Sequence, residues 1–325
     1  MDIKLYYQEK GTGEPLILLH GNGEDSSYFI NQIDYFQNAY HVIALDTRGH
    51  GKSPRGEAPF TIEQFSCDLY DFMQGHQISN AIILGFSDGA NIAMKFAMKH
   101  PSMVKGLILN GGNLEPMGVK RTTQIPIEIG YKIASRFAGK SEAAKRNAEM
   151  LGLMVNEPNI KPSELSLISM PALVICGTKD MIKESHTKKI AEYLPNAKLA
   201  IIRGNHFIAN KNPKTFNQEV DAFLKTVLHL PICYMFEQSG NFHFINLTSR
   251  HERGAAVNTA LSFYIAIPAN TPLWFVVLFH HHYMYRTLTN SKLLRRLTHC
   301  RIVFYDIIRN VYRAFFDIIL QGFPP

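Results

Sequence analysis

Residues 81–100 read AIILGFSDGANIAMKFAMKH, an apolar strand pattern that runs directly into a helical pattern. The glycine-rich segment Gly85-Phe86-Ser87-Asp88-Gly89 joins the two. A sharp strand-to-helix turn holds its central residue in a strained conformation, and glycines on either side let the neighbouring backbone fit. The pattern therefore predicts a serine nucleophile, Ser87, exposed at the end of a strand. The alternative is a plain glycine-rich turn.

Apolar runs bounded by turn residues also occur elsewhere in the first 230 residues. They are Pro15–Leu19, His41–Leu45, Leu107–Leu109, Ala172–Cys176 and Leu199–Ile202. Continuous runs of this kind fit strands that are buried on both faces of a parallel sheet. Helical patterns separate them, at Ser27–Gln37, Ile62–Gln74, Glu184–Leu194 and Pro213–Leu228. This alternation predicts an α/β fold with a mostly parallel, doubly wound sheet.

Residues 113–170 interrupt the alternation. Helices are predicted there at Gln124–Ala138, Lys140–Met154 and Lys161–Ile168, with no clear strand between them. An insertion at the carboxyl ends of strands is a candidate lid over a site, and a purely structural excursion is the alternative. Its apolar side chains would line an acyl pocket or form the lid's own packing face. These side chains are Met117, Ile125, Ile127, Ile129, Tyr131, Phe137, Met150, Leu151, Leu153 and Met154.

A serine hydroxyl needs a base that takes its proton and an acid that orients the base. His206 follows the last predicted strand, inside the segment GNH at 204–206. Asp180 ends the run ALVICGTKD, which contains the strand before it. The loop after the preceding predicted strand offers Asn110, which has no carboxylate. We therefore expect Ser87, His206 and Asp180 to form a catalytic triad.

The segment His20-Gly21-Asn22-Gly23 follows the predicted strand Pro15–Leu19. A reaction at a carbonyl group develops negative charge on its oxygen, and two preorganised N–H donors stabilise that charge. A glycine-rich loop lets backbone amides come close to such an oxygen. We expect the backbone N–H groups of Asn22 and Asp88 to form this oxyanion hole, with a simple tight turn as the alternative.

Together these motifs resemble the α/β-hydrolase superfamily, in its lid-bearing branch of small serine esterases, thioesterases, aminopeptidases and C–C hydrolases. The resemblance covers about residues 2–228. It rests on HGNG at 20–23, DTRGHGKS at 46–53, GFSDG at 85–89, GTKD at 177–180 and GNH at 204–206. It implies the α/β-hydrolase fold, with the chain order Ser…Asp…His that is expected of it. It also implies a core made of residues 1–112 and 171–230, with the helical lid, 113–170, inserted before the acid-bearing strand.

The same resemblance predicts the chemistry. We expect a serine hydrolase that cleaves a small ester, thioester or amide through an acyl-enzyme on Ser87, with no metal or organic cofactor. Asp46 and Arg48 are expected to be scaffold residues. Three alternatives remain: an acyltransferase with the same triad, a hydrolase-fold sensor of a small ligand, and a membrane-anchored lipase. Ser87 argues against the dehalogenases and epoxide hydrolases of this fold, which use an aspartate nucleophile.

Asp88 departs from the uncharged residue that many relatives carry after the nucleophile. An acid in the first turn of a helix is favoured by the helix dipole, by about 0.3–1 kcal/mol. The other interpretation is that Asp88 contacts a cationic group on the substrate. Hydrolases of this superfamily that are specific for α-amino-acid esters carry the same Ser-Asp-Gly step.

Composition changes near residue 230. Residues 1–230 hold 25 Lys+Arg against 23 Asp+Glu, whereas residues 231–325 hold 9 against 4, mostly arginine. The overall charge of +7 is therefore concentrated in the C-terminal extension, 231–325, and does not predict a nucleic-acid partner. Three interpretations of the extension stay open. It is an appendage that contacts a membrane or a protein through a helix at 301–320, a fused or frameshifted segment, or a part that folds back onto the hydrolase.

Composition, cysteine and histidine spacing, and the uncharged run 254–279 bear on fold class, metal binding and location. With 46% hydrophobic and 19% charged residues the composition excludes disorder and coiled coil. Four cysteines lack metal-binding spacing, and consecutive histidines at 280–282 cannot all face one ion. Residues 254–279 are uncharged and long enough to span a membrane, but their prolines argue against a spanning helix. Without a signal-peptide pattern, a cytoplasmic location is predicted, with peripheral membrane association through the extension as an alternative.

Overall fold

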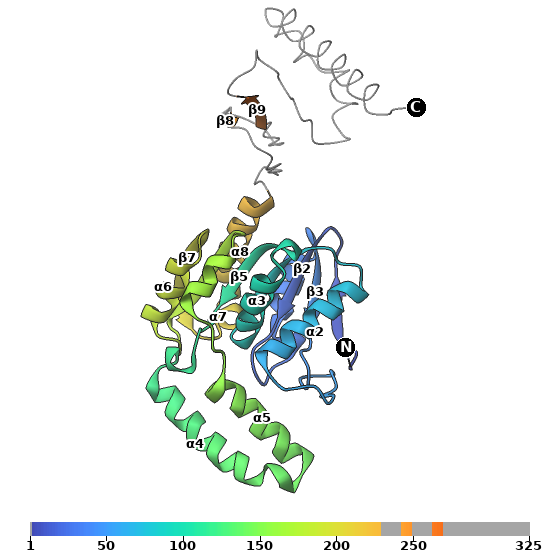
Figure 1. Cartoon of the computed structure of the whole chain (residues 1–325), viewed down its shortest axis with the longest axis vertical. Helices are drawn as coiled ribbons and strands as arrows, with labels where there is room; N and C mark the ends of the chain where they lie inside the picture. Colours follow the sequence, from blue (N-terminus) through green and yellow to red (C-terminus); the bar gives the residue numbers. More distant parts are fainter. Residues whose placement is uncertain (1, 229–241, 249–261, 269–325) are drawn as a thin grey trace, which may run out of the picture. The chain divides into compact units, whose positions relative to one another are not determined.

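The computed structural model describes residues 2–228, 242–248 and 262–268 (Figure 1). The chain divides into two units, residues 1–230 and residues 231–325. The first unit contains every candidate site residue that the sequence analysis identified.

A seven-stranded sheet organises the first unit, in the spatial order β1-β3-β2-β4-β5-β6-β7. The strands are β1 (Tyr7–Lys10), β2 (Glu14–Leu19), β3 (Tyr40–Leu45), β4 (Ala81–Phe86), β5 (Val104–Asn110), β6 (Ala172–Lys179) and β7 (Ala197–Asn205). β1 runs antiparallel to β3, and every other neighbouring pair is parallel. The predicted parallel sheet is thereby confirmed, and its carboxyl ends meet along one edge.

Alternate strand residues feed two hydrophobic cores, one on each face of the sheet. In β2, Ile17 and Leu19 belong to one core, while Leu16 and Leu18 belong to the other. The first core is covered by α2 (Ile62–Gly75), α3 (Asp88–Lys99) and α6 (Glu184–Tyr193). The second is covered by η1 (Ser26–Phe29), α1 (Ile30–Phe36), α7 (Ile208–Lys211) and α8 (Pro213–Leu228). Helices on both faces make the sheet doubly wound, as predicted.

The lid lies between β5 and β6 in the chain. It contains η3 (Pro116–Gly118), α4 (Arg121–Phe137), η4 (Ala138–Lys140), α5 (Glu142–Asn156) and η5 (Pro162–Leu167). α4 and α5 lie side by side and project beyond the body of the sheet (Figure 1). The third predicted helix is a short 3-10 turn, η5, with Pro162 as its first residue.

Several apolar side chains of the lid are exposed, along one face of α4 and before it. Ile125, Ile129, Ile133 and Phe137 are 41%, 53%, 57% and 43% exposed, and Met117 before the helix is 71% exposed. Residues four apart share a helix face, so the four α4 side chains form one exposed apolar stripe. Leu153 of α5, in contrast, is buried.

In the second unit the structure describes two strands, β8 (Phe242–Thr248) and β9 (Ser262–Pro268). They pair antiparallel, from Phe242 opposite Pro268 to Thr248 opposite Ser262. β9 occupies part of the uncharged run 254–279, which is extended there and not helical. The helix predicted at 301–320 lies outside the described residues. Within the described ranges, no helix has both the length and the apolar character needed to cross a membrane.

Candidate active site

Ser87 occupies the turn between β4 and α3. Its backbone has φ +53° and ψ −118°, in the positive-φ region that residues other than glycine rarely adopt. Strain of this kind costs of order 1–3 kcal/mol and persists only where the surroundings enforce it. The Ser87 N–H donates to the Asn110 carbonyl at the end of β5 (2.8 Å), and the Ser87 carbonyl accepts from the Ala90 N–H (2.9 Å). Contacts on both sides thus hold the turn in place.

The two glycines of the turn are required by close backbone contacts. A Cβ atom at Gly85 would lie 2.2 Å from the Gly89 carbonyl oxygen, and one at Gly89 would lie 2.0 Å from the Leu19 carbonyl oxygen. Both distances are far below van der Waals contact. Any side chain at these positions would push α3 away from β2 and β4, and would displace Ser87.

His206 lies within hydrogen-bond distance of both predicted partners. Its Nε2 is 3.0 Å from the Ser87 Oγ, and its Nδ1 is 2.7 Å from the Asp180 Oδ1. The imidazole is 4% exposed and packs against the Phe86 ring, with 4.8 Å between centroids. A carboxylate accepts, so Nδ1–H donates to Asp180, and Nε2 is left as the acceptor for the Ser87 hydroxyl.

Asp180 is 3% exposed, in the loop that follows β6. The Ile182 N–H donates to its Oδ1 at 2.9 Å, and the Gly177 N–H approaches its Oδ2 at 3.5 Å. Burial by itself would raise the pKa of Asp180, but the hydrogen bond and charge of His206, with these amides, hold the pKa below its usual value. Asp180 is therefore ionised at neutral pH.

The loop predicted to hold the oxyanion lies next to Ser87. A Cβ atom at Gly21 would be 3.1 Å from the Ser87 Cβ. His20 fixes this loop: its Nδ1–H donates to the Gly21 carbonyl (2.7 Å), and its Nε2 accepts from the Thr47 N–H (3.0 Å). Burial, with the nearby His50, lowers the pKa of His20 to about 4, so the ring stays neutral.

The second predicted oxyanion donor is the backbone N–H of Asp88. Asp88 is the first residue of α3, and the first N–H groups of a helix have no partner within the helix. The positive end of the α3 dipole adds to the attraction for an anion there. The structure thus brings together Ser87, His206 and Asp180, and it places the Asn22 loop and the start of α3 beside Ser87.

Sequence and structure comparisons identify proteins that share this fold. The family described as "alpha/beta hydrolase fold" matches residues 14–149. The chain is 27% identical to 3-oxoadipate enol-lactonase 2 of Acinetobacter baylyi, over 69% of this chain and 94% of that relative. The chain has the α/β-hydrolase fold, and these matches indicate the α/β-hydrolase superfamily.

Other matches place this α/β-hydrolase among enzymes. (E)-2-((N-methylformamido)methylene)succinate hydrolase of Acinetobacter baylyi is 26% identical over 68% of this chain and 94% of the relative. The crystal structure of the enol-lactonase from Burkholderia xenovorans LB400 superposes with a TM-score of 0.59 at 20% identity, covering 69% of this chain and 97% of that one. The curated relatives support a hydrolase, and the structural likeness shows the fold.

The lid of this α/β-hydrolase contacts the predicted site in ways that the sequence motifs do not reveal. The Asn22 side-chain amide donates to the Met150 carbonyl of α5, with 2.7 Å between Nδ2 and O. At the start of α4, the Lys120 ammonium donates to the backbone carbonyl of Asp180. The Lys120 N–H also donates to the Met181 carbonyl (2.8 Å). The loops that carry Asn22 and Asp180 are therefore both hydrogen-bonded to the lid.

Asp88 is 9% exposed and only partly satisfied. Its Oδ1 accepts from the Asn91 side-chain amide at 3.2 Å, whereas its Oδ2 is buried with no hydrogen-bond partner among the described residues. Burial raises the pKa of Asp88 to about 6, and the negative charge of Glu157 adds to this rise. The side-chain amides of Asn91 and Asn22 and the charge of His206 act in the opposite direction. The buried carboxyl of Asp88, next to Ser87 in the chain, thus has one oxygen without a hydrogen-bond partner among the described residues.

Glu24 is a second acid near the site that the sequence analysis missed. Its Oε2 is buried without a hydrogen-bond partner in the described part of the chain. Burial raises the pKa of Glu24 to about 7, against the lowering effects of the Gly21 backbone and of His206. Tyr28, which stacks on Phe86 with 4.4 Å between ring centroids, has a buried hydroxyl that is also unpartnered there.

Asp46 and Arg48 serve the scaffold. The Asp46 carboxylate accepts from the backbone N–H groups of Ser26 (2.7 Å) and Lys52 (2.8 Å), which fixes the two loops on either side. Arg48 is fully buried, and its guanidinium bonds both carboxylate oxygens of Asp68 (2.7 and 2.6 Å). Neither residue contacts Ser87, His206 or Asp180. Within the described ranges, no group of three His, Cys, Asp or Glu residues is placed to hold a metal ion.

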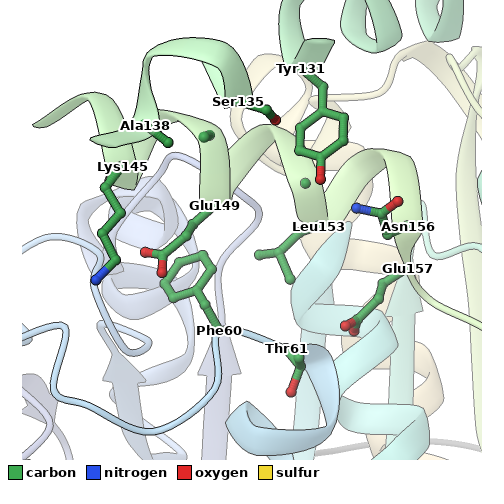
Figure 2. Close-up of a pocket in the computed structure, with 12 residues that line it drawn as sticks. Phe60, Thr61, Tyr131, Ser135, Ala138, Lys145, Glu149, Leu153, Asn156 and Glu157 are labelled. Carbon is green, nitrogen blue, oxygen red and sulfur yellow. The ribbon is translucent and has the colours of Figure 1, made fainter. Parts of the chain in front are cut away.

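A cavity of about 360 Å³ lies between the lid and the loop before α2 (Figure 2). Phe60 and Leu153 form its apolar floor, and Tyr131, Lys145 and Glu157 are among its polar lining residues. Leu153 lines this cavity, whose lining includes none of Ser87, His206 and Asp180. Nothing in the motifs pointed to Glu157, because its place depends on how the lid packs on the core.

Proposed function

We propose that this α/β-hydrolase is a serine hydrolase that cleaves a small carboxylic ester, thioester or amide through an acyl-enzyme on Ser87. The observation that supports it most is the continuous hydrogen-bonded line from the Ser87 Oγ through His206 to Asp180. A strained turn at the nucleophile and a base whose tautomer is set by a buried carboxylate are what acyl transfer needs.

In the first half of the reaction, the Ser87 Oγ attacks the carbonyl carbon of the substrate as His206 Nε2 takes the hydroxyl proton. The C=O bond opens to a tetrahedral oxyanion. The C–O bond to the leaving group then breaks, and the imidazolium returns its proton to the departing alkoxide. Asp180 stays ionised throughout and stabilises the imidazolium.

In the second half, water replaces the alcohol. His206 Nε2 takes a proton from the water as its oxygen attacks the acyl carbon. The bond between that carbon and the Ser87 Oγ then breaks, the proton passes to Oγ, and the carboxylic acid leaves. Each half forms one oxyanion, which we assign to the backbone N–H groups of Asn22 and Asp88. A single donor of this kind is worth about 10²–10³ in rate.

Two features narrow the substrate. The enol-lactonase relative is named for a lactone, which is a cyclic ester, and this favours carboxylic esters over amides. Asp88 adds a charge preference, because its free buried Oδ2 lies beside the nucleophile. We infer that Asp88 contacts an ammonium group near the scissile carbonyl, as in an α-amino-acid ester.

Steady-state hydrolysis of p-nitrophenyl acetate tests the serine mechanism. We expect the wild type to turn over the ester. We expect kcat to fall by about 10⁴-fold or more in Ser87→Ala, His206→Ala and Asp180→Asn. The double variant Ser87→Ala/His206→Ala should lose no more than Ser87→Ala alone, since the residues act as a unit. Full activity in Ser87→Ala would rule out the proposal.

The same assay separates the alternatives. A burst of one equivalent of p-nitrophenol without further turnover is expected of a ligand sensor that captures its acyl group. Faster p-nitrophenol release with added alcohol, together with formation of the new ester, is expected of an acyltransferase. Turnover that leads to free acetate at the same rate supports the hydrolase.

A further inference from the structure

The lid carries most of the large apolar side chains that are exposed in residues 2–228. Ten such side chains are exposed there, and six of them belong to the lid: Met117, Ile125, Ile129, Ile133, Phe137 and Leu167. Four of the six form the stripe along α4, in the part of the lid that projects beyond the sheet (Figure 1). Single exposed apolar side chains are ordinary on a protein surface, whereas a continuous row of them marks an interaction surface.

Positive charge is concentrated on the same helix. Residues 120–140 contain five lysines and arginines and a single acid, Glu128. The rest of residues 1–230 contain 20 basic and 22 acidic residues. The α4 segment is therefore a basic region in a unit that is otherwise weakly acidic.

Three of the basic side chains lie beside the apolar stripe. Arg121 is four positions before Ile125, on the same side of the helix. Lys132 and Arg136 come seven positions, or about two helical turns, after Ile125 and Ile129. All three cations are exposed, and in the described part of the chain none of them forms an ion pair within 4.0 Å. Their charges are thus available to an anionic partner.

A helix with an apolar stripe and a row of unpaired cations beside it suits the surface of an anionic membrane. Its apolar side chains enter the boundary between headgroups and acyl chains, while lysine and arginine are attracted to the lipid phosphates. A ridge of aliphatic side chains needs no complementary groove in a lipid surface, whereas a protein partner would have to supply one. Pairing of this face with a second copy of the chain would bring like charges together.

We propose that α4 is a membrane-contacting helix, whose exposed stripe binds an anionic lipid surface with Arg121, Lys132 and Arg136 on the phosphates. The helix would lie in the plane of the interface, with its apolar face toward the acyl chains. Lipid binding of this kind needs no reaction at Ser87, so the proposal is independent of the proposed function. It is also distinct from membrane association through the C-terminal extension.

Co-sedimentation of the purified, full-length protein with lipid vesicles tests this surface. One set of vesicles contains phosphatidylglycerol and phosphatidylcholine in about equal amounts, and the other contains phosphatidylcholine alone. We expect binding to the anionic vesicles to be about tenfold stronger or more, because the neutral vesicles offer no net charge to the cations. Binding to the anionic vesicles should weaken as salt is added, since the charges are exposed and therefore screened.

Two double variants separate the apolar part of the surface from the charged part. Ile129→Ser/Ile133→Ser removes the two middle side chains of the stripe, and Lys132→Gln/Arg136→Gln removes two of the cations. All four side chains are exposed, so we expect the variants to fold like the wild type. Each variant should bind the anionic vesicles about tenfold more weakly or less, and the charge variant should also be less sensitive to salt.

The matched controls remove the same kinds of side chain outside the lid. Ile30→Ser/Tyr35→Ser removes two side chains of α1 that are each 46% exposed. Lys211→Gln/Lys214→Gln removes two exposed cations, one in α7 and one in α8. We expect both controls to bind the vesicles like the wild type, and thermal melts check that every variant is folded.

Three results would overturn the proposal: no binding of the wild type to anionic vesicles, equal binding to both kinds of vesicle, or unchanged binding in either α4 variant. The last result would assign the binding to another part of the chain, such as the C-terminal extension. Sedimentation velocity without lipid covers the other occupant of the stripe. A dimer that is lost in Ile129→Ser/Ile133→Ser, in a protein that binds no vesicles, would assign the stripe to a second copy of this chain.

Discussion

The side chain of Asn22, in the loop that carries a proposed oxyanion donor, is hydrogen-bonded to the Met150 carbonyl of the lid, with 2.7 Å between Nδ2 and O. The two residues are 128 positions apart in the chain. One residue earlier in α5, Glu149 pairs with Arg55 of the core. The lid is therefore bonded directly to the loop that would hold the oxyanion. A shift of the lid should change the position of the Asn22 backbone N–H.

Asn22→Ala tests this coupling, because alanine keeps the backbone N–H and removes the side-chain amide, which bonds the Met150 carbonyl and also acts on Asp88. We expect kcat for p-nitrophenyl acetate to fall by about tenfold to a hundredfold, as small misplacements of a catalytic group do, with little change in Tm. Asn159→Ala is the matched control: it removes a similar bond to a backbone carbonyl, that of Asn156, within the lid. Equal kcat values in the two variants would contradict the coupling.

The Arg55–Glu149 ion pair should hold α5 against the core. Both side chains are about one-fifth exposed, so the pair is partly shielded from solvent. In Glu149→Gln we expect amide hydrogen exchange in α5 to speed up by as much as about fivefold, the equivalent of 1 kcal/mol. Exchange in α8, which lies outside the lid, should stay unchanged and serves as the internal control. Unchanged exchange in α5 would show that the pair does not fasten the lid.

Selectivity for an amine next to the ester should depend on pH through Asp88. Its pKa of about 6 means that the carboxyl is neutral below and negative above that pH, while an α-ammonium stays charged on the acidic side. Glu157 and His206 are the other charged groups that act on it. The ratio of kcat/KM for a leucine p-nitrophenyl ester to that of its N-acetyl form should therefore fall as pH drops from about 7.5 to about 5.

The ratio is used because any pH effect on the reaction at Ser87 is common to both substrates and cancels. In Asp88→Asn we expect the ratio to be low throughout and flat with pH. A wild-type ratio that is flat over the same range, or an Asp88→Asn ratio that still falls, would exclude Asp88 as the cation contact.

Glu24 should make the stability of the fold depend on pH, because its carboxyl is protonated more readily in the folded state. Its pKa is raised from 4.5 to about 7, so between these values the folded state holds a proton that the unfolded state has lost. Stability therefore falls as pH rises through this window, and the loss is complete above about 7. Gln carries no such charge, so Glu24→Gln should raise Tm by more at about pH 8 than at about pH 4.5. A Tm difference that is constant with pH would show that Glu24 is not buried as a free carboxyl.

The elements of the sheet and the residues at their ends were predictable from local sequence. Apolar runs such as Ala172–Cys176 are buried on both faces, so their pattern is strong and their carboxyl ends could be located. β1 is not among the predicted apolar runs, because Tyr7–Lys10 is a polar edge strand that is only half-buried. Ser87, His206 and Asp180 each directly follow a strand, and this position makes them identifiable from the local sequence pattern.

Residues positioned by tertiary packing could not be predicted in the same way. Periodicity shows that Ile125 and Ile129 share a face of α4, but it does not show which face meets α5. In the sequence, Glu24 and Glu157 look like ordinary surface acids. Their burial and their hydrogen-bond partners are decided only when distant segments of the chain come together. Lys120 is one of nineteen lysines in residues 1–230, and its bond to the Asp180 carbonyl has no local signal.

The most direct measurement is covalent labelling of the purified, full-length protein with a fluorophosphonate, followed by mass spectrometry of the peptides and with Ser87→Ala as the control. A fluorophosphonate phosphorylates a serine only where a base takes the hydroxyl proton and the oxyanion is stabilised. The expected result is one adduct per chain, on Ser87, that is absent from the control. A folded wild type that stays unlabelled, or that carries its adduct on another residue, would contradict Ser87 as the activated nucleophile.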